Sequence, residues 1–328
     1  MKVLIITYYW PPAGGSGVQR WLKFVKYLQG FNIQPIVYTI SNPRYPTIDD
    51  SLLNEIPENI EVLKHPIWEP TDLLFWKREF QQEGGISNAS KNSFLSFIRG
   101  NFFIPDPKLF WIKPSVKYLQ RYLNKNDVDV IISTGPPHSM HLIAEKLHQK
   151  NDVKWLADFR DPWSDIYYNK DFKELSFVKN RNKKLEKSVL KKADCVLTVS
   201  NALKKEFSKY ANRVEVVTNG FDDDFLEPSK VLLDEKFTIS YIGLLPKQSN
   251  PENLFRVLQA LCSQYKDFEK DLQLNFIGDI SDVVKTAVYN NKLKENTRFI
   301  DYVDPVSYTH LRAHETSLHL VCRLLLEK

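Results

Sequence analysis

Short apolar runs alternate with helical patterns along most of this 328-residue chain, and this alternation is what most restricts its fold. A run that is apolar throughout is typical of a strand buried on both faces, and strands that alternate with helices form a parallel sheet covered by helices. The predicted strands lie at residues 2–7, 33–40, 60–64, 128–133, 153–157 and 195–199, and in a second series at 237–242, 274–277 and 298–303. The sequence therefore predicts an α/β fold, in which ligands bind beyond the carboxyl ends of the strands.

The two series of strands are separated by a segment typical of a linker. Residues 219–235 contain a glycine, a proline and four aspartates, and a chain of this length has room for about two domains. We place the boundary near residue 225, which gives an N-terminal domain at 1–225 and a C-terminal domain at 226–304.

Composition indicates a protein of the cytoplasm. No apolar run approaches the ~20 residues of a membrane span, and Met1-Lys2 leads directly into a predicted strand rather than into a signal peptide. Cys195 and Cys262 lie in apolar surroundings, which favours buried thiols over a disulfide framework. The formal net charge of +5 is only mildly basic, so we expect no nucleic acid partner.

Residues 305–328 are interpreted as a non-native tail. Residues 306–316, VSYTHLRAHET, resemble the conceptual translation of a transposase-based sequencing adapter, and residues 320–328, LVCRLLLEK, resemble the flanking end of the same adapter. Two constant blocks in one reading frame are hard to obtain by accident. We therefore take Asp304 as the last native residue and exclude the histidines and the cysteine of this tail from any metal or thiol site.

A glycine-rich turn follows the first predicted strand. Gly14, Gly15 and Gly17 stand between the apolar run KVLIIT and a helical pattern that reaches Leu28, with Gly30 as its predicted left-handed end. Backbone amides at a helix N-terminus attract anions, and glycine lets a ligand approach them closely. The turn is a candidate phosphate site, although its spacing differs from the dinucleotide fingerprint and the glycines can also simply close a tight turn.

The turn after the fourth predicted strand, STGPPHS, leads into another helix. Ser139 is placed to cap this helix, and His138 stands at its N-terminus. An imidazole in that position can donate to a sugar hydroxyl or a phosphate oxygen, and the alternative is a histidine with only a local hydrogen bond. His138 is therefore a candidate catalytic residue.

The fifth predicted strand is followed by DFRDPW, which carries two carboxylates three positions apart. Asp158 and Asp161 can orient hydroxyls or serve as a base, Arg160 lies between them, and Trp163 offers a flat face on which a sugar can stack. The alternative is an Asp–Arg pair with a structural role. No further ligand accompanies the two carboxylates at metal spacing, and the Asp-x-Asp pattern at 222–224 is interpreted as solvated turn residues, so no metal site is expected.

Residues 79–113 depart from the alternating plan. Aromatic and basic side chains interleave, and Pro105, Pro107 and Pro114 are expected to break any long helix. Such an element can lie in a membrane interface, which makes 91–113 a candidate for peripheral contact with the inner face of the cell membrane. The alternative is a loop-rich insertion whose aromatic side chains pack on the core.

Six segments taken in order resemble glycosyltransferase family 4, a group of the GT-B superfamily. They are ITYYWPPAGGSGVQR, STGPPHS, WLADFRDPW, ADCVLTVSNAL, VEVVTNGFDDDF and FTISYIG, and the resemblance covers essentially residues 1–304. It implies two Rossmann-like domains that face each other across a cleft, with a nucleotide-sugar donor mainly on the second domain and a glycan or lipid-linked acceptor on the first. It also implies surface polysaccharide or glycolipid synthesis by a metal-independent reaction that usually retains the anomeric configuration.

The resemblance also assigns roles to single residues. It places Gly14, Gly15, Gly17 and Gly243 beside the donor phosphates, His138 near the transferred sugar, and Asp158, Asp161, Arg160, Trp163 and Asn219 along the cleft. Leu244 and Asn250-Pro251 stand where many members have an arginine and a Lys-Gly pair, so Lys247 is the cation expected to neutralise the leaving diphosphate. The family's glutamate pair would lie beyond Asp304, and we expect the chain as it stands to be inactive.

Three other readings of the same residues stay open. If the reaction inverts the anomeric centre, Asp161 or Asp158 has to act as the base. A nucleotide-sugar epimerase would use the same fold without an acceptor, and a non-catalytic sugar-binding scaffold would bind the acceptor without transfer. A nicotinamide-dependent enzyme is disfavoured because G-x-G-x-x-G does not follow the first strand. No cofactor is expected beyond the nucleotide sugar, which is a co-substrate.

Overall fold

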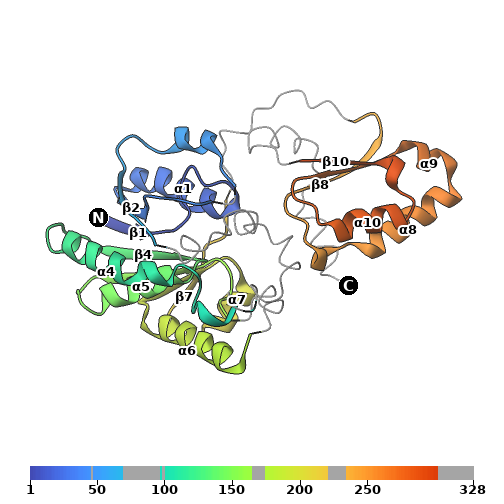
Figure 1. The fold of residues 1–328 in the computed structure, drawn as a ribbon. Coiled ribbons are helices and arrows are strands. Elements are labelled where there is room, and N and C mark those ends of the chain that lie inside the picture. The colour runs from blue at the N-terminus through green and yellow to red at the C-terminus, as the bar shows by residue number, and fades with distance from the viewer. Residues whose placement is uncertain (46, 69–96, 98–99, 165–173, 221–233, 302–328) are drawn as a thin grey trace. The chain divides into compact units, whose positions relative to one another are not determined.

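The computed structural model describes residues 1–45, 47–68, 97, 100–164, 174–220 and 234–301. The chain divides into two compact units (Figure 1). Unit 1 contains the described residues up to Gly220, and unit 2 contains those from Asp234 onward. The predicted boundary near residue 225 and the predicted non-native tail both lie outside the described residues.

The sheet of unit 1 has seven parallel strands in the order β3-β2-β1-β4-β5-β6-β7. Their bounds are β1 Lys2–Ile6, β2 Gln34–Ile40, β3 Glu61–His65, β4 Val130–Gly135, β5 Lys154–Phe159, β6 Cys195–Thr198 and β7 Val214–Val216. The six strands predicted for this part of the chain are confirmed. β7 carries no recognisable pattern, because it has only three residues with Glu215 between two valines.

The central position of β1 explains its unbroken apolar run. Ile5 pairs with Val37 of β2 on one side and with Ile132 of β4 on the other. Leu4 and Ile5 belong to the cores on opposite faces of the sheet, and both side chains are fully buried. A strand that is covered on both faces has no position for a polar side chain, as the sequence indicates.

Helices cover both faces of this sheet. α1 Ser16–Leu28 packs on one face, and α4 Leu109–Leu123, α5 Ser139–His148 and α6 Ser176–Lys192 pack on the other (Figure 1). Unit 1 also contains α7 Asn201–Phe207 and the short turns η1 Gln29–Phe31 and η2 Asp50–Glu55. All parallel strands direct their carboxyl ends to one edge, where the loops after β1, β4 and β5 lie.

Two predictions about helix ends are wrong. Gly30 lies inside η1, and the left-handed residue is Asn32 with φ +57°; an asparagine side chain tolerates that conformation. Pro114 lies inside α4 instead of ending it. Trp111 and Leu119 of this helix are completely buried, and we attribute its continuity to that burial, which offsets the single backbone hydrogen bond lost at the proline.

Unit 2 repeats the alternating plan on a smaller scale. Its three parallel strands have the order β10-β9-β8, with β8 Phe237–Ile242, β9 Leu272–Ile277 and β10 Thr297–Ile300. The helices are α8 Glu252–Gln264, α9 Lys266–Asp271 and α10 Asp282–Asn290, with short turns η6 Lys247–Ser249 and η7 Lys294–Asn296. Phe255, Leu274 and Val284 form the centre of a separate core. The strands predicted for this series are present.

Candidate active site

The glycine-rich turn leads from β1 into α1 and is closed on one side by Thr47. The amide of Gly14 donates to the carbonyl of Thr47 at 2.9 Å, and a Cβ on Gly14 would lie 2.9 Å from Thr47 Cγ2. Gly15 has φ +91° and directly precedes the first residue of α1. Gly14 therefore makes a structural hydrogen bond where the sequence predicts a phosphate contact, and Gly15 turns the chain into the helix.

Arg160, just after β5, ties this turn to the loop that follows β4. Its Nη1 donates to the carbonyl of Gly17 at 2.9 Å, Nη2 donates to Pro136 at 2.7 Å and Nε donates to Gly135 at 3.2 Å. A Cβ on Gly17 would lie 3.0 Å from Nη1, so the guanidinium occupies the space that a larger residue would need. Burial lowers the pKa of Arg160, and the carboxylates of Asp158 and Asp161 oppose that shift.

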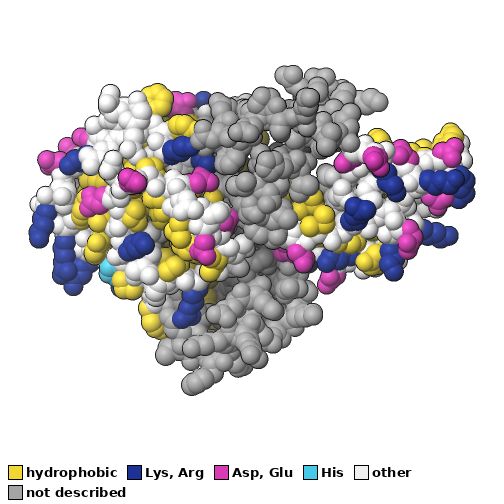
Figure 2. Space-filling view, turned by 90° about the horizontal axis from the view of Figure 1, so that it is seen from above, with side chains coloured by type: hydrophobic (Ala, Val, Ile, Leu, Met, Phe, Trp, Pro, Cys, Tyr) yellow, Lys and Arg dark blue, Asp and Glu magenta, His cyan; other side chains and the backbone are white. Residues whose placement is uncertain are grey.

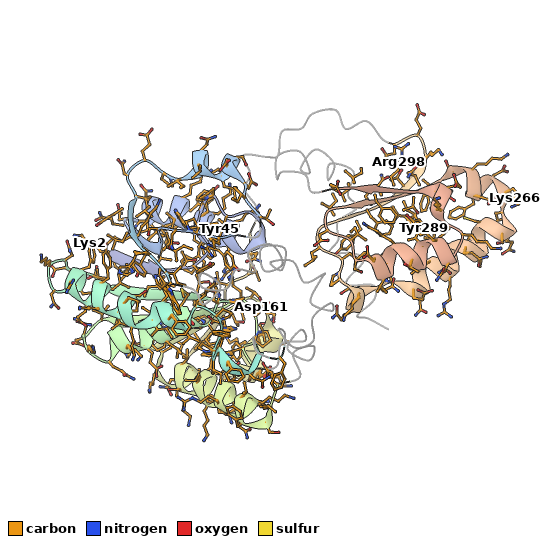
Figure 3. All side chains as sticks on the ribbon, viewed as in Figure 1. Lys2, Tyr45, Asp161, Lys266, Tyr289 and Arg298 are labelled. Atoms are coloured by element: carbon orange, nitrogen blue, oxygen red, sulfur yellow. The ribbon has the colours of Figure 1, made fainter. Side chains whose placement is uncertain are left out.

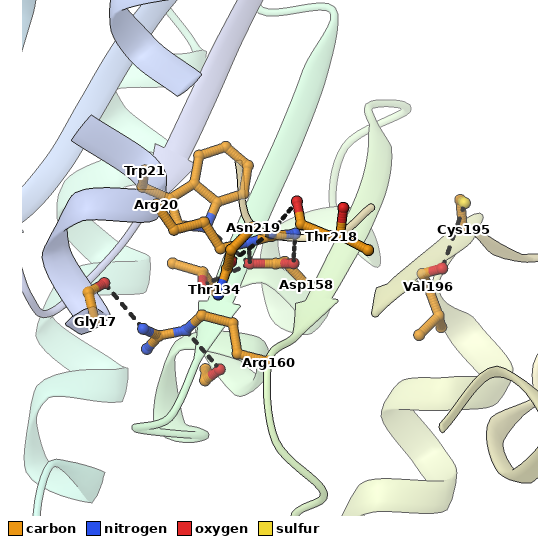
Figure 4. A network of polar contacts seen from close by, with 11 residues as sticks. Gly17, Arg20, Trp21, Thr134, Asp158, Arg160, Cys195, Val196, Thr218 and Asn219 are labelled. Carbon is orange, nitrogen blue, oxygen red and sulfur yellow. Dashed lines mark hydrogen bonds and ion pairs between the residues drawn. The ribbon is translucent and has the colours of Figure 1, made fainter. Parts of the chain in front are cut away.

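Asp158 is enclosed by hydrogen-bond donors from α1 and β4 (Figure 4). Arg20 Nη2 donates to Oδ1 at 3.0 Å, and Oδ2 accepts from Trp21 Nε1 at 2.7 Å and from Thr134 Oγ1 at 2.9 Å. The carboxylate is completely buried. The sequence predicts Asp158 as a catalytic candidate, but a carboxylate with these contacts holds α1 and β4 against β5 and is withdrawn from substrate. Its cation is Arg20, not the neighbouring Arg160.

The network around Asp158 also reaches Asn219. Arg20 Nη1 donates to Asn219 Oδ1 at 3.0 Å and to the carbonyl of Thr218 at 3.2 Å. Asn219 itself is exposed. α1 therefore positions this residue, which the sequence predicts to line the site, through a single arginine.

His138 lies at the start of α5 and is almost fully buried. Its ring stacks on Trp163, with ring centroids 4.7 Å apart and planes at 3°. Burial, together with the charge of Arg160, lowers the pKa of His138 to about 3, so the ring is neutral at physiological pH. Trp163 is only 2% exposed. The predicted sugar-stacking role of Trp163 is therefore wrong, because the indole packs on the histidine and lies in the core.

The N-terminus of α5 is capped by a residue that the sequence does not point to. Asp106 accepts hydrogen bonds from the amide and the hydroxyl of Ser139, both at 2.8 Å. The prediction that Ser139 caps the helix itself is wrong, because its hydroxyl donates to a carboxylate that comes from the preceding segment. That carboxylate already occupies the positive end of the α5 dipole.

Asp161 is the accessible one of the two predicted carboxylates. Figure 3 shows it just beyond β5, at the end of the sheet opposite Lys2, where β1 begins. The side chain is exposed. Partial burial of the carboxyl group raises the pKa of Asp161, and the charge of Arg160 opposes the shift.

The predicted donor residues Gly243 and Lys247 belong to unit 2. Gly243 directly follows β8 with φ +134°, and its amide donates to the carbonyl of Ile277 at 2.8 Å. A Cβ on Gly278 would lie 2.6 Å from the carbonyl oxygen of Gly243, so the two turns pack directly on each other. Lys247 begins η6 and is exposed.

A sequence comparison matches one segment of the chain to a known family. Residues 86–225 match the family Glycosyltransferase Family 4. This match supports assignment of the chain to glycosyltransferase family 4. A search of curated proteins finds no match.

Solved structures support a GT-B fold for this glycosyltransferase. A sucrose-phosphate synthase from Thermosynechococcus elongatus has a TM-score of 0.58 at 14% identity, over 95% of this chain and 73% of that one. The trehalose-6-phosphate structure from E. coli bound with UDP-2-fluoro glucose has a TM-score of 0.59 at 10% identity, over 95% and 76%. The lipopolysaccharide outer core galactosyltransferase WaaB has a TM-score of 0.54 at 12% identity, over 96% and 71%.

In unit 1 of the glycosyltransferase, the predicted residues after β1, β4 and β5 form one connected group. Arg20, Trp21 and Asp106 complete it and are not predicted from the sequence. Arg20 and Trp21 are both buried, but Arg20 lies off the apolar stripe of α1 that contains Trp21, so the helical pattern gives no signal for it. Within the described ranges, no three histidine, cysteine, aspartate or glutamate side chains are grouped as metal ligands; residues 222–224 lie outside those ranges.

Proposed function

We propose that this glycosyltransferase moves a sugar from a nucleotide-sugar donor to a glycan or lipid-linked acceptor, with retention of configuration and without a metal ion or other cofactor. The observation that carries the mechanism is the state of Asp158. Its carboxylate is buried and accepts from Arg20, Trp21 and Thr134, so it is not available to take a proton from an acceptor hydroxyl. A front-face reaction needs no such base, because the leaving phosphate can take that proton.

His138 fits the same mechanism. A histidine whose pKa lies far below neutrality carries no charge, so it can orient a sugar hydroxyl by hydrogen bonding but is a poor acid or base. Asp161 remains as the candidate base for an inverting reaction, since it is exposed beside the group. The stereochemistry of the product therefore separates the two mechanisms.

Arg160 is proposed to assist the leaving diphosphate from unit 1. Three of its five N–H groups donate to backbone carbonyls, which fixes the plane of the guanidinium. The remaining N–H groups of this fixed guanidinium can donate to the leaving diphosphate, whose negative charge grows as the bond to the sugar breaks. Within unit 2, Lys247 stays the proposed cation for a donor diphosphate.

A membrane-bound acceptor is supported by the helical layer of α4, α5 and α6. In these three fully described helices every exposed charged side chain is basic, and Glu145 and Glu186 are buried. The exposed basic residues are Lys113, Lys117, Arg121, Lys146, Lys179, Arg181, Lys183, Lys184, Lys187, Lys191 and Lys192. We call this surface the basic layer. It suits the negative surface of a membrane rich in anionic lipid.

Exposed apolar side chains lie at the start of two of these helices. Phe110 at the start of α4 is 40% exposed, and Phe177 at the start of α6 is 62% exposed. The backbone amide of Leu175 donates to Asn101 Oδ1 at 2.7 Å, which joins the start of α6 to the segment before α4. Aromatic rings beside lysines are typical of a surface that lies in a membrane interface. None of the helices that the structure describes is long and apolar enough to cross a membrane.

The described part of the aromatic-basic segment has both buried and exposed aromatic side chains. Trp111 is fully buried in the core, whereas Phe102 is 71% exposed. Residues 79–96, 98 and 99 lie outside the described residues. We therefore extend the proposed membrane contact from 91–113 to the basic layer.

The test begins with the source gene read again across codon 304, which establishes the residues that follow Asp304. The purified protein is incubated with a panel of nucleotide sugars, with and without a lipid-linked acceptor, and release of nucleoside diphosphate is followed. We expect release of nucleoside diphosphate that needs the acceptor and persists in EDTA. We also expect the product to have the anomeric configuration of the donor. Donor consumption without acceptor would indicate an epimerase or a hydrolase, and acceptor binding without release would indicate a scaffold.

A further inference from the structure

A chain of buried polar groups runs from β5 to the histidine at the start of α5. Trp155 Nε1 donates to Ser133 Oγ at 2.9 Å, and Ser133 Oγ lies 2.8 Å from His141 Nδ1. All three side chains are completely buried. A serine hydroxyl has one hydrogen, and the acceptor within its reach here is His141 Nδ1. Ser133 therefore donates to Nδ1, and a neutral His141 carries its proton on Nε2.

Nε2 of His141 and Nδ1 of His138 both lie beside Gly135. Nε2 of His141 is enclosed without a hydrogen-bond partner among the described residues, and so is Nδ1 of His138. The point where a Cβ on Gly135 would lie is 2.6 Å from the first nitrogen and 3.0 Å from the second. The two nitrogens therefore converge on one small space that exists because residue 135 is glycine.

Stacking fixes the planes of both rings. His138 stacks on Trp163 at 3° between planes, and His141 stacks on Phe159 at 16° with centroids 4.4 Å apart. The contact of His141 Nδ1 with Ser133 Oγ decides which edge of that ring lies beside Gly135. An N–H group opposite a second N–H group is repelled, whereas an N–H group opposite a lone pair is attracted.

We infer that Ser133 and His141 are positioning residues that fix His138 in the tautomer with its proton on Nε2, so that His138 offers an N–H donor to an oxygen of the sugar substrate. The inference rests on the proposed function for the identity of that substrate. His138 is 6% exposed, and because its Nδ1 is buried, Nε2 is the ring nitrogen left to meet a substrate. The tautomer makes His138 a donor to a hydroxyl or phosphate oxygen and excludes it as an acceptor at that atom.

The tautomers can be read directly in the whole chain without substrate. Long-range ¹H–¹⁵N spectra of protein labelled at histidine are recorded at pH 8, where even an ordinary histidine is mostly neutral. Signals are assigned from the spectra of His138→Gln and His141→Gln. Both histidines are expected as the Nε2–H tautomer. A proton on Nδ1 of either ring, or a mixture at His138, overturns the inference whatever the variants do.

Three variants test the relay itself. Ser133→Ala and His141→Leu remove the directing groups and should turn His138 into a mixture of tautomers, whereas His141→Gln keeps an N–H near the position of Nε2 and should preserve the single tautomer. In the active full-length protein, the first two should lower kcat/KM about tenfold, the effect of one hydrogen bond to the substrate, and His141→Gln should restore most of it. His65→Gln, in β3, is the matched control.

Different results would contradict the inference about His138 and the proposed function. If His138 keeps one tautomer in Ser133→Ala and His141→Leu, these residues serve packing alone and the inference is wrong. If the tautomers behave as expected but no nucleotide sugar is consumed, the proposed function is wrong while the inference about His138 stands.

Discussion

The carboxylate of Asp158 and the guanidinium of Arg20 form an ion pair that water hardly reaches, since their side chains are 0% and 2% exposed. Removing one partner of such a pair leaves a buried charge without compensation. Arg20→Met is therefore expected to lower the free energy of unfolding by about 3–5 kcal/mol. Urea denaturation followed by tryptophan fluorescence measures the change, because Trp21 donates to the same carboxylate.

Lys23 provides the matched control on the same helix. It pairs with Glu55 at the surface, where both side chains are more than 20% exposed. Because exposed pairs contribute little, Lys23→Met should cost less than about 1 kcal/mol. Equal losses in the two variants would mean that Asp158 is not held as the structure describes.

Substitution of Asp161 distinguishes a retaining from an inverting reaction. If the reaction retains configuration and the leaving phosphate takes the proton, Asp161→Asn should keep kcat within about tenfold of the parent value, because no general base is lost. The measurement is nucleoside diphosphate release by the full-length protein, with the product anomer determined by NMR. A fall of about 10²–10⁴-fold in kcat with unchanged donor affinity would instead assign Asp161 as the base of an inverting reaction.

The cap of α5 belongs to the scale of elements, because Asp106 fixes one helix through a segment that precedes another. Losing the hydrogen bonds to Ser139 should make Asp106→Ala about 0.5–2 kcal/mol less stable than the parent, as for other helix caps. Asp106→Asn keeps an acceptor and should cost less. Urea denaturation at several pH values compares the three proteins.

The pH dependence of this cap follows from its burial. Burial raises the pKa of Asp106 above its ordinary value, and the hydrogen bonds from Ser139 oppose that shift. The folded state therefore holds this proton to a higher pH than the unfolded state does, so the contribution of Asp106 to stability declines as pH rises through its folded pKa. The stability of Asp106→Asn relative to the parent should improve over that range. A difference that stays constant with pH would contradict the assignment.

Elements whose own residues form a hydrophobic pattern could be predicted from the sequence. Elements and contacts that depend on residues far away in the chain could not. β1 reads as a buried strand because every residue after Lys2 packs on one of two cores. Trp163 reads as an exposed sugar platform because nothing in the sequence says that His138 covers it. Asp106 is 33 residues from Ser139, and β7 is recognisable only once Val214 pairs with Val196. Contacts made across the fold are absent from any local pattern.

At the scale of the whole molecule, a net charge of +5 conceals an uneven distribution. The basic layer gathers its charge on α4, α5 and α6 of unit 1, whereas basic and acidic side chains are intermixed on the face of unit 2 that Figure 2 shows. The sequence predicts a mildly basic protein because it averages over these surfaces. Which helices share a face becomes visible only when the sheet orders them, with α4, α5 and α6 side by side (Figure 1).

The basic layer leads to a prediction about vesicle binding. Lysine and arginine near an anionic bilayer contribute about 1 kcal/mol each, so replacing Lys183, Lys184 and Lys187 of α6 by glutamate should weaken binding by at least about 100-fold. Sedimentation with vesicles of phosphatidylcholine and phosphatidylglycerol measures the affinity. Binding of the parent protein should also fall as salt rises, because screening shortens the reach of these charges.

The control carries the same change of charge on unit 2. Lys236, Lys270 and Lys294 are exposed there, and replacing them by glutamate alters the net charge equally without touching the basic layer. If binding depends on net charge alone, both triple variants lose it to the same extent. If binding depends on the basic layer, only the α6 variant loses it. Phe177→Ser should then weaken the binding that persists in high salt, because the aromatic ring contributes by burial in the membrane interface rather than by charge. Equal binding to pure phosphatidylcholine vesicles would contradict an anionic membrane as the partner of this surface.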